Sequence, residues 1–523
     1  MSEIRNNITV TPQGIIYLCK CPLENDYKNQ LTFANATAQY NYFYGTKQKM
    51  YDNYTYVKKD NTISVGENID NIITCNYLFY KNTGFSNKYY YCFITNMEYV
   101  NENCTRITFE TDCFQTWYFD IVYKQCFVER EHVNDDTLGL HTIPEGLEIG
   151  EYKVNSHLND AYNNQVCAIL GTSEDILNSY ATGVNVYNNI PSPLFYYRFD
   201  TASSLGTMID TLNQAGKQDT IQSLFIAPKW ICPNIGQTIA IQTSSSPATQ
   251  TLGITRISTL DGYTPKNNKM LCWPYCYIGM SNGVGQYNQY HQEQWTLTNN
   301  EMKVQLYGCL VSGTSIKAVP LNYLGNGVAW DDAITIGKYP PLAWQNDSYT
   351  NWLTQNGVNL FGVTLNAEQA GMIGGVAKAA IGASIGEPTM LGGGIRDVFD
   401  VMQESYRHDV VPVGVRGSLN SGDVMISAGA NTLHVYRVTI KNEYAQIIDK
   451  YLSCFGYKVN TVKTPNITGR VNWNYVKTVN CNFEGDIPQT DLNIIKTMFN
   501  NGVTLWHNPS TMYDYSATNT IVS

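Results

Sequence analysis

The chain has 523 residues, enough for about three or four domains, and only 15% of them are charged, with a formal net charge of −10. This acidic balance argues against a protein that grips nucleic acid, because gripping phosphates requires patches of Lys and Arg. It is compatible with a wall past which nucleic acid slides, since negative charge repels phosphate. The 39 tyrosines and the scarcity of charge are typical of subunit contacts. The codon bias of an AT-rich genome would produce a similar composition, and both explanations stay open.

The first 150 residues are predicted to form a β domain. Runs of β-branched and aromatic residues alternate with clusters of Asn, Asp and Gly, and helical periodicity is scarce. Short connections between these runs indicate antiparallel pairing. The expected strands cover residues 14–18, 77–80, 89–94, 105–109 and 120–123.

From residue 151 to 364 the strand pattern continues with longer polar connections. The patterns at 173–180 and 203–215 predict two short helices. This part is therefore interpreted as a second β-rich region.

Residues 365–431 differ in composition from everything around them. Within them, residues 370–395 hold eight glycines and only two charges, Lys378 and Glu387. A loop of this length with no obvious role in a core is usually functional or disordered. Gly375, Ala379 and Ala383 recur every fourth residue, a small-residue spacing that lets helices approach closely in lipid. We interpret the segment as a long, Gly-rich hydrophobic loop insertion that acts on membranes; a glycine loop shielded inside an assembly is the alternative.

The apolar and small residues of this insertion are the candidate membrane-active residues. They are Met372, Ile373, Gly374, Gly375, Val376, Ala379, Ala380, Ile381, Gly382, Ile385, Met390, Leu391, Ile395, Val398 and Phe399.

Residues 432–523 are expected to form an α+β segment. A strand pattern at 433–438 precedes a helix whose apolar positions are Tyr444, Ile447, Ile448, Tyr451 and Leu452, with Gly456 as its C-terminal glycine. A second helix is expected to begin at a Thr490 cap and to end at Gly502. Its apolar face carries Ile494, Ile495, Met498 and Phe499.

The motifs of common enzymes are absent or weak. Gly382–Gly386 matches G-x-S-x-G, but its flanks lack the strand and helix that a nucleophile elbow needs. The seven histidines do not cluster along the chain. The 14 cysteines, including the pairs Cys19/Cys21 and Cys272/Cys276, are expected to be reduced and buried.

Three pairs of acidic residues remain, and we expect them to be solvated in turns. They are Asp135/Asp136, Glu145/Glu148 and Asp331/Asp332. No catalytic residue, metal ligand or cofactor site is predicted, and we do not expect an enzyme.

Two further observations concern location. The first residues lack the basic and apolar regions of a signal peptide, so the N-x-S/T triplets are not expected to be glycosylated. No run of about 18 apolar residues predicts a transmembrane helix.

Four stretches of the sequence resemble the tail knob proteins of small, short-tailed, protein-primed podoviruses. CFGYKVNTVKTPNITGRVNWNYVKT at 454–478 and EGDIPQTDLNIIKTMFNNGVTLWHN at 484–508 carry the resemblance most clearly. The runs at 67–82 and 94–121 fit the same pattern, and the order of β region, Gly-rich loop and FGYKV segment matches.

The resemblance implies a fold that is mainly β, with barrel-like tail-tube domains, a few helices and a long hydrophobic loop. Residues 1–150 would form a tube-wall domain, 151–364 the distal β-rich region, 365–431 the loop, and 432–523 a segment that completes the tube wall. Six copies would form a tube at the distal end of the tail, joined to the lower collar protein. The loops would plug the tube and then enter the host cytoplasmic membrane, which opens a channel for viral DNA. Such a protein is a virion component made in the host cytoplasm.

Two other functions were weighed. A tail adhesin could bind cell-wall glycans through its Tyr- and Trp-rich middle region, residues 151–360. A wall-degrading hydrolase could use a pair of carboxylates.

Overall fold

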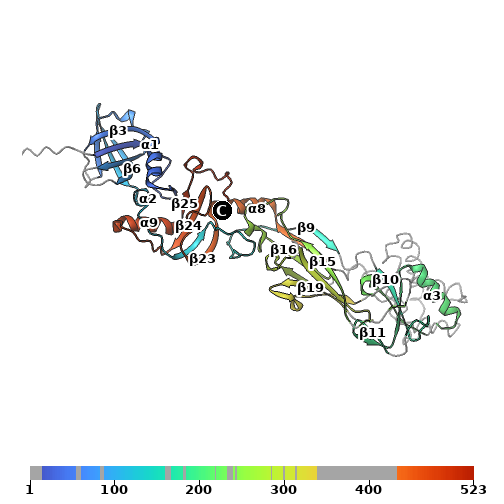
Figure 1. Cartoon of the computed structure of the whole chain (residues 1–523). Coiled ribbons are helices and arrows are strands. Elements are labelled where there is room, and N and C mark those ends of the chain that lie inside the picture. Colours follow the sequence, from blue (N-terminus) through green and yellow to red (C-terminus); the bar gives the residue numbers. More distant parts are fainter. Residues whose placement is uncertain are drawn as a thin grey trace, which may run out of the picture. The chain divides into compact units, whose positions relative to one another are not determined.

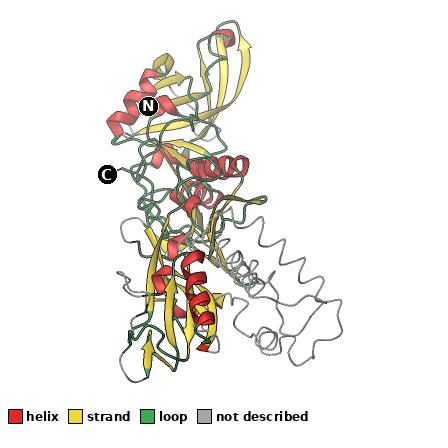
Figure 2. Cartoon of the chain, turned by 90° about the vertical axis from the view of Figure 1, so that its right-hand side faces the viewer, coloured by secondary structure: helices red, strands yellow, loops and turns green. Residues whose placement is uncertain are grey.

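The computed structural model of the chain describes residues 14–54, 61–82, 88–159, 166–180, 184–217, 220–232, 240–241, 244, 246–283, 285–297, 301–311, 315–338 and 433–522. The chain divides into two compact units, each described by itself below. Unit 1 comprises Met1–Ile149, Pro265–Met270 and Glu443–Ser523, and unit 2 comprises Gly150–Thr264 and Leu271–Asn442. Strands, yellow in Figure 2, dominate the described residues, which confirms the prediction of a mainly β protein.

Unit 1 contains a six-stranded antiparallel sheet that curls toward a barrel (Figure 1). Its edges approach each other, because the Gly66 N–H beyond one edge strand donates to the Tyr54 hydroxyl on the other (3.0 Å). Lys49 and Glu67 form an ion pair across the same gap (3.1 Å). In spatial order the strands are β3 (Lys47–Tyr54), β1 (Gly14–Cys19), β5 (Tyr77–Asn82), β6 (Tyr89–Asn101), β7 (Cys104–Thr111) and β4 (Thr62–Val65).

The central strands β1 and β5 of this sheet are buried on both faces, and alternation along them divides the residues between two cores. Ile16, Leu18 and Leu78 lie in one core. Tyr17, Phe79 and their neighbours lie in the other. Helix α1 (Ala36–Gly45) contributes Phe43 to the second core, where its ring stacks on that of Tyr77 with centroids 5.2 Å apart.

A second sheet of unit 1 is built from both ends of the chain. Its order is β2 (Asn29–Leu31), β25 (Val503–Trp506), β24 (Trp473–Val479), β8 (Cys126–Glu131) and β23 (Tyr457–Lys463). The β2–β25 pair is parallel, and the other pairs are antiparallel. Trp473 and Trp506 are buried with ring centroids 5.3 Å apart, and they join the second core of the curled sheet. Helices α2 (Cys113–Trp117), α8 (Asn442–Phe455) and α9 (Gln489–Asn501) complete this part.

The helix ends test the predicted caps. Gly456 follows α8 with φ +65°, and a Cβ there would meet the carbonyl of Glu131 at 2.2 Å, so glycine is required. Gly502 ends α9 with φ +93°, also as predicted. Thr490 is not the cap of α9, because that helix begins at Gln489 after Pro488.

A short excursion of the chain, Pro265–Met270, belongs to unit 1 although its neighbours in sequence belong to unit 2. The buried carboxylate of Asp449 accepts the backbone N–H groups of Lys266 (2.8 Å) and Asn267 (3.1 Å). Lys269 forms an ion pair with Glu145, whose side chain is 0% exposed. Arg130 pairs with the same carboxylate, and the Lys458 N–H donates to it (3.0 Å). The prediction that Glu145 is solvated is therefore wrong, since three donors from distant segments compensate its burial.

Unit 2 contains two larger antiparallel sheets. The first has the order β15 (Ala248–Thr255), β18 (Glu301–Gly308), β19 (Ser315–Tyr323) and β20 (Asn326–Val328), and β21 (Ile334–Lys338) also pairs with β19. The second has the order β17 (Tyr287–Tyr290), β16 (Cys276–Ser281), β22 (His434–Ile440) and β9 (Tyr152–Asn159).

Two smaller sheets complete unit 2. One has the order β13 (Phe195–Phe199), β10 (Val166–Thr172) and β14 (Ile221–Pro228), and the other pairs β11 (Asn185–Tyr187) with β12 (Ile190–Ser192). Helix α3 (Ala202–Gln214) buries Leu205, Ile209 and Leu212 in the core of the three-stranded sheet.

The described 3-10 helices of both units are η1 (Ile69–Asn71), η3 (Lys229–Ile231), η4 (Asn268–Leu271), η5 (Gln292–Gln294), η6 (Trp330–Asp332) and η10 (Pro509–Thr511).

Most of the predicted elements are confirmed, including the strands at 14–18, 77–80, 89–94 and 105–109 and the helix at 203–215. The strand expected at 120–123 is wrong, because this segment makes a single bridge, from Val122 to Glu484. The helix expected at 173–180 is also wrong. There the Asp175 carboxylate accepts the backbone N–H groups of Leu177 and Tyr180 and the Tyr197 hydroxyl, so a side-chain turn replaces helical bonding. The long hydrophobic insertion lies outside the described residues.

Replacing Glu145 by Gln should lower the free energy of unfolding by about 3–5 kcal/mol, because Arg130 and Lys269 would remain buried without a countercharge. Urea unfolding followed by tryptophan fluorescence measures the change. Glu148→Gln is the matched control, since Glu148 is exposed. Equal stability of the two variants would contradict the assigned role of Glu145.

Asp112 should give the stability a distinct pH dependence. Burial raises the pKa of its carboxyl to about 7, although the Gln115 N–H (3.0 Å) and the Tyr77 hydroxyl (2.9 Å) donate to it. The folded state therefore holds this proton more tightly than the unfolded state, whose pKa is about 3.8. As the pH rises from about 4 to about 7, the free energy of unfolding of the wild type should fall by up to about 1.4 kcal/mol per pH unit relative to that of Asp112→Asn. Parallel urea titrations of the two proteins over this range measure the difference, and a constant difference would refute the prediction.

Candidate functional site

The described residues include the kinds of side chain that could hold a metal or act as nucleophiles. No group of three or more His, Cys, Asp or Glu among them could hold a metal ion. None of the 14 cysteines, which all lie within the described residues, forms a disulfide, and all but Cys104 are buried, which confirms the expected burial. In the part of the chain that the structure describes, no helix has the length and hydropathy needed to cross a membrane.

The buried titratable groups have structural partners. His132 accepts the Tyr475 N–H at Nδ1 (2.8 Å) and donates from Nε2 to the Ser453 carbonyl (3.0 Å). Burial lowers its pKa to about 3, which keeps the ring neutral in this role. Asp136 accepts the Tyr457 hydroxyl (2.6 Å) and the Asn268 N–H (3.0 Å). These groups hold segments of unit 1 together.

The candidate membrane-active residues, from Met372 to Phe399, lie outside the described residues, and so does the G-x-S-x-G motif at Gly382–Gly386. The structure does describe the two strands that flank them. Strand β21 ends at Lys338, and β22 begins at His434. Both strands belong to unit 2.

One hairpin contacts both of these flanking strands. In the turn between β16 and β17, the Asn282 amide donates to the Thr335 carbonyl of β21 (2.8 Å). The Gln286 side chain accepts the Thr335 N–H (2.9 Å). Strand β16 itself pairs with β22, where Ser281 is opposite His434. The β16–β17 hairpin therefore fixes the positions at which the chain leaves for residues 339–432 and returns from them.

Two histidines meet beside the return point. Nε2 of His157 and Nδ1 of His434 are 2.9 Å apart, and Tyr436 stacks on His157 with ring centroids 4.7 Å apart. One ring donates and the other accepts, so this bond requires an unprotonated acceptor nitrogen. The histidines are scattered along the chain, and cross-strand pairing of β9 and β22 brings this pair together in space.

An apolar row lies on the second sheet of unit 1. Phe127 of β8 is in register with Val462 of β23 on one side and with Val479 of β24 on the other. All three side chains are exposed, Val462 at 64%. Directly opposed residues in a sheet have neighbouring side chains, so the three form one apolar row on the surface. Such a row on an ordered sheet is typical of a protein contact surface.

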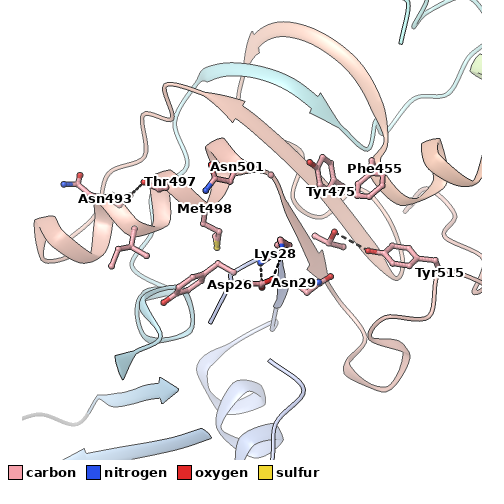
Figure 3. Close-up of a pocket in the computed structure, with 14 residues that line it drawn as sticks. Asp26, Lys28, Asn29, Phe455, Tyr475, Asn493, Thr497, Met498, Asn501 and Tyr515 are labelled. Atoms are coloured by element: carbon pink, nitrogen blue, oxygen red, sulfur yellow. Dashed lines mark hydrogen bonds and ion pairs between the residues drawn. The ribbon is translucent and has the colours of Figure 1, made fainter. Parts of the chain in front are cut away.

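A hollow of about 740 Å³ opens elsewhere in unit 1 (Figure 3). Met498 points toward Asp26 and Lys28, which form an ion pair (3.0 Å), while Phe455 and Tyr475 line another side. The other lining residues include Ile494, exposed at 37%, and Tyr515. Apolar and aromatic groups with a polar rim suit a protein contact rather than catalysis.

Sequence periodicity assigned some of these surface residues to the core. Ile447 and Ile494 were placed on buried helix faces, but they are 68% and 37% exposed. The row of Phe127, Val462 and Val479 was missed, because register between strands is not visible in a linear pattern. An alignment of residues 126–131 and 457–463 as neighbouring strands is the signal that could have revealed this row.

Two models of known protein families match parts of this chain. The family model of the C-terminal domain of the tail knob protein gp9 of Bacillus phage phi29 matches residues 241–520, more than half of the chain. The model of the N-terminus of caudoviral major tail proteins matches residues 11–124.

Whole-chain relatives agree with these matches. The tail knob proteins gp9 of Bacillus phages PZA, B103 and phi29 are each 26% identical over 96% of this chain and 97% of their own length. The solved structure of the bacteriophage C1 tail knob protein gp12 has a TM-score of 0.68 and 16% identity, covering 97% of this chain and 100% of that chain.

Proposed function

The chain belongs to the phi29 gp9 family of phage tail knob proteins, and from this premise we propose its function. It is a structural component of a phage tail. Copies of the chain form a homohexameric tube at the distal end of the tail. The tube is plugged by hydrophobic loops that later penetrate the host cytoplasmic membrane.

The domain roles follow the sequence division. Residues 1–150 and 432–523 form the tube wall, with unit 1 as its main body, and residues 151–364 form the distal region. The match of residues 11–124 to the N-terminus of major tail proteins supports a tube-wall role for the curled sheet. Residues 365–431 are the plug.

Assembly of the tube uses the exposed apolar surface of unit 1. The row of Phe127, Val462 and Val479 supplies an apolar patch without charge. The low charged fraction of the chain, 15%, supports self-association in the same way. The lower collar protein is the neighbour at the other end of the tube.

Membrane entry uses the loop. Its Gly, Ala and Ile residues, from Met372 to Phe399, can enter lipid, and small residues allow several copies to approach closely. The seven carboxylates of residues 365–431 oppose entry while they are ionised. Once the loops leave the lumen, viral DNA passes along an acidic wall that does not bind it, since the chain carries a net charge of −10. No enzymatic step is needed.

Val462→Asp should reduce ring assembly while changing the free energy of unfolding by less than about 0.5 kcal/mol, because this side chain is exposed. A charge in the apolar row would have to be desolvated in a subunit contact. Analytical ultracentrifugation and negative-stain electron microscopy measure the fraction of sixfold rings. Ile73→Asp is the control, since Ile73 is 62% exposed and lies outside the row. Intact rings of the Val462 variant would contradict this surface assignment.

Ile381→Asp should reduce dye release from liposomes at pH 5 by about 100-fold, because an aspartate at the centre of a membrane helix costs about 3 kcal/mol. Ile447→Asp is the matched control, a similar charge on an exposed residue outside the loop. Wild type and control should release dye equally. Release that is unchanged in Ile381→Asp, or absent from the wild type, would refute membrane penetration by the loop without affecting the tube assignment.

A further inference from the structure

A second hollow, of about 410 Å³, lies in unit 2 and has a basic and hydroxylated lining. It has no part in tube assembly or loop insertion as proposed above. The residues that carry its chemistry are Lys153, Ser156, Arg256, Ser258, Thr259 and Arg437.

The fold fixes the two arginines of this hollow on ordered backbone. Arg437 lies on β22 directly opposite Ser156 of β9. Arg256 follows β15 and precedes Ile257, whose N–H donates to the Gln292 side-chain oxygen (2.9 Å) and whose carbonyl accepts from its amide nitrogen (3.2 Å). Gln292 is 1% exposed, so a buried side chain holds the segment between Arg256 and Ser258.

The charges of the hollow do not cancel. Lys153 forms an ion pair with Asp261 (2.6 Å), the carboxylate in the lining, and this lysine lowers the pKa of Asp261. The Asn442 N–H also donates to Asp261 (3.3 Å). The guanidinium groups of Arg256 and Arg437 form no ion pair or hydrogen bond within the described part of the chain, so two positive charges remain. In a chain with a net charge of −10, this is a local excess of the opposite sign.

We propose that this hollow binds a single phosphate group, free or carried by an ester. Two guanidinium groups present parallel N–H donors that match the oxygens of a phosphate, and a doubly charged anion balances both. The hydroxyls of Ser156, Ser258 and Thr259 can donate to the remaining oxygens. A singly charged carboxylate would leave one arginine uncompensated.

A polynucleotide is a poorer fit. Gripping a nucleic-acid backbone requires a stripe of cations that follows successive phosphates. Here Asp261 lies within the lining, and the excess charge is confined to one hollow. Free phosphate, a polyol phosphate and a phospholipid headgroup share the favoured chemistry.

The test uses the full chain and isothermal titration calorimetry with inorganic phosphate and with glycerol 3-phosphate. Cosedimentation with phosphatidylglycerol vesicles, against phosphatidylcholine vesicles, forms the lipid arm. Arg256→Gln and Arg437→Gln should each weaken phosphate binding about tenfold or more, because each removes charged hydrogen bonds. Arg106→Gln is the matched control, since Arg106 is an exposed arginine paired with Glu98 in unit 1. It should bind like the wild type.

A measurement on the wild type alone tests the proposal even if the variants fail to fold. Phosphate should raise the melting temperature of the wild type above that in sodium chloride of equal ionic strength. Binding of the small phosphates identifies a soluble ligand, and binding of phosphatidylglycerol vesicles alone, lost in both variants, identifies a headgroup. The proposal is overturned if no probe binds or if both variants bind like the wild type.

Discussion

The burial of Glu145 is the constraint on which the arrangement of unit 1 depends. A buried carboxylate costs several kcal/mol unless cations and N–H donors surround it. Its partners are Arg130 on β8, Lys269 in the excursion Pro265–Met270, and the N–H of Lys458 on β23. These groups come from three distant parts of the chain, so the charge is compensated only when all three are in place. Asp449 acts in the same way on the backbone of Lys266 and Asn267.

Unit 2 meets a different requirement, because it must hold both ends of the 94-residue segment 339–432. The proposed function requires this segment to change its path. The β16–β17 hairpin holds these ends through side-chain hydrogen bonds to the backbone of β21 and backbone pairing with β22. Asn282 and Gln286 fix β21, while β16 pairs with β22. None of these bonds involves a residue of the insertion itself. The ends can therefore stay in place whatever path the insertion takes.

Charge and apolar surface are distributed according to these tasks. Ion pairs such as Lys49–Glu67 and Arg106–Glu98 balance locally on unit 1. The apolar row of Phe127, Val462 and Val479 carries no charge of its own. In unit 2, Arg256 and Arg437 line one hollow, and neither guanidinium group forms an ion pair with the described residues. A chain that is acidic overall thus keeps one place suited to an anion.

The sequence by itself determined what depends on local pattern. Alternation predicted strands such as β5 and β7, and glycine positions predicted the helix ends at Gly456 and Gly502. Composition set residues 365–431 apart, and the residue runs at 454–478 and 484–508 carried the resemblance to the family. Local pattern failed at Asp175, whose carboxylate replaced helical bonding, and at Ile447, whose helical position did not decide its burial. Tertiary structure alone decided that Glu145 is buried, that Phe127 meets Val462 and Val479, and that Arg256 and Arg437 share a hollow. The physical reason is the same in each case. Burial, register and charge compensation are set by partners that are mostly far away in the sequence, and a one-dimensional pattern does not show which residues meet.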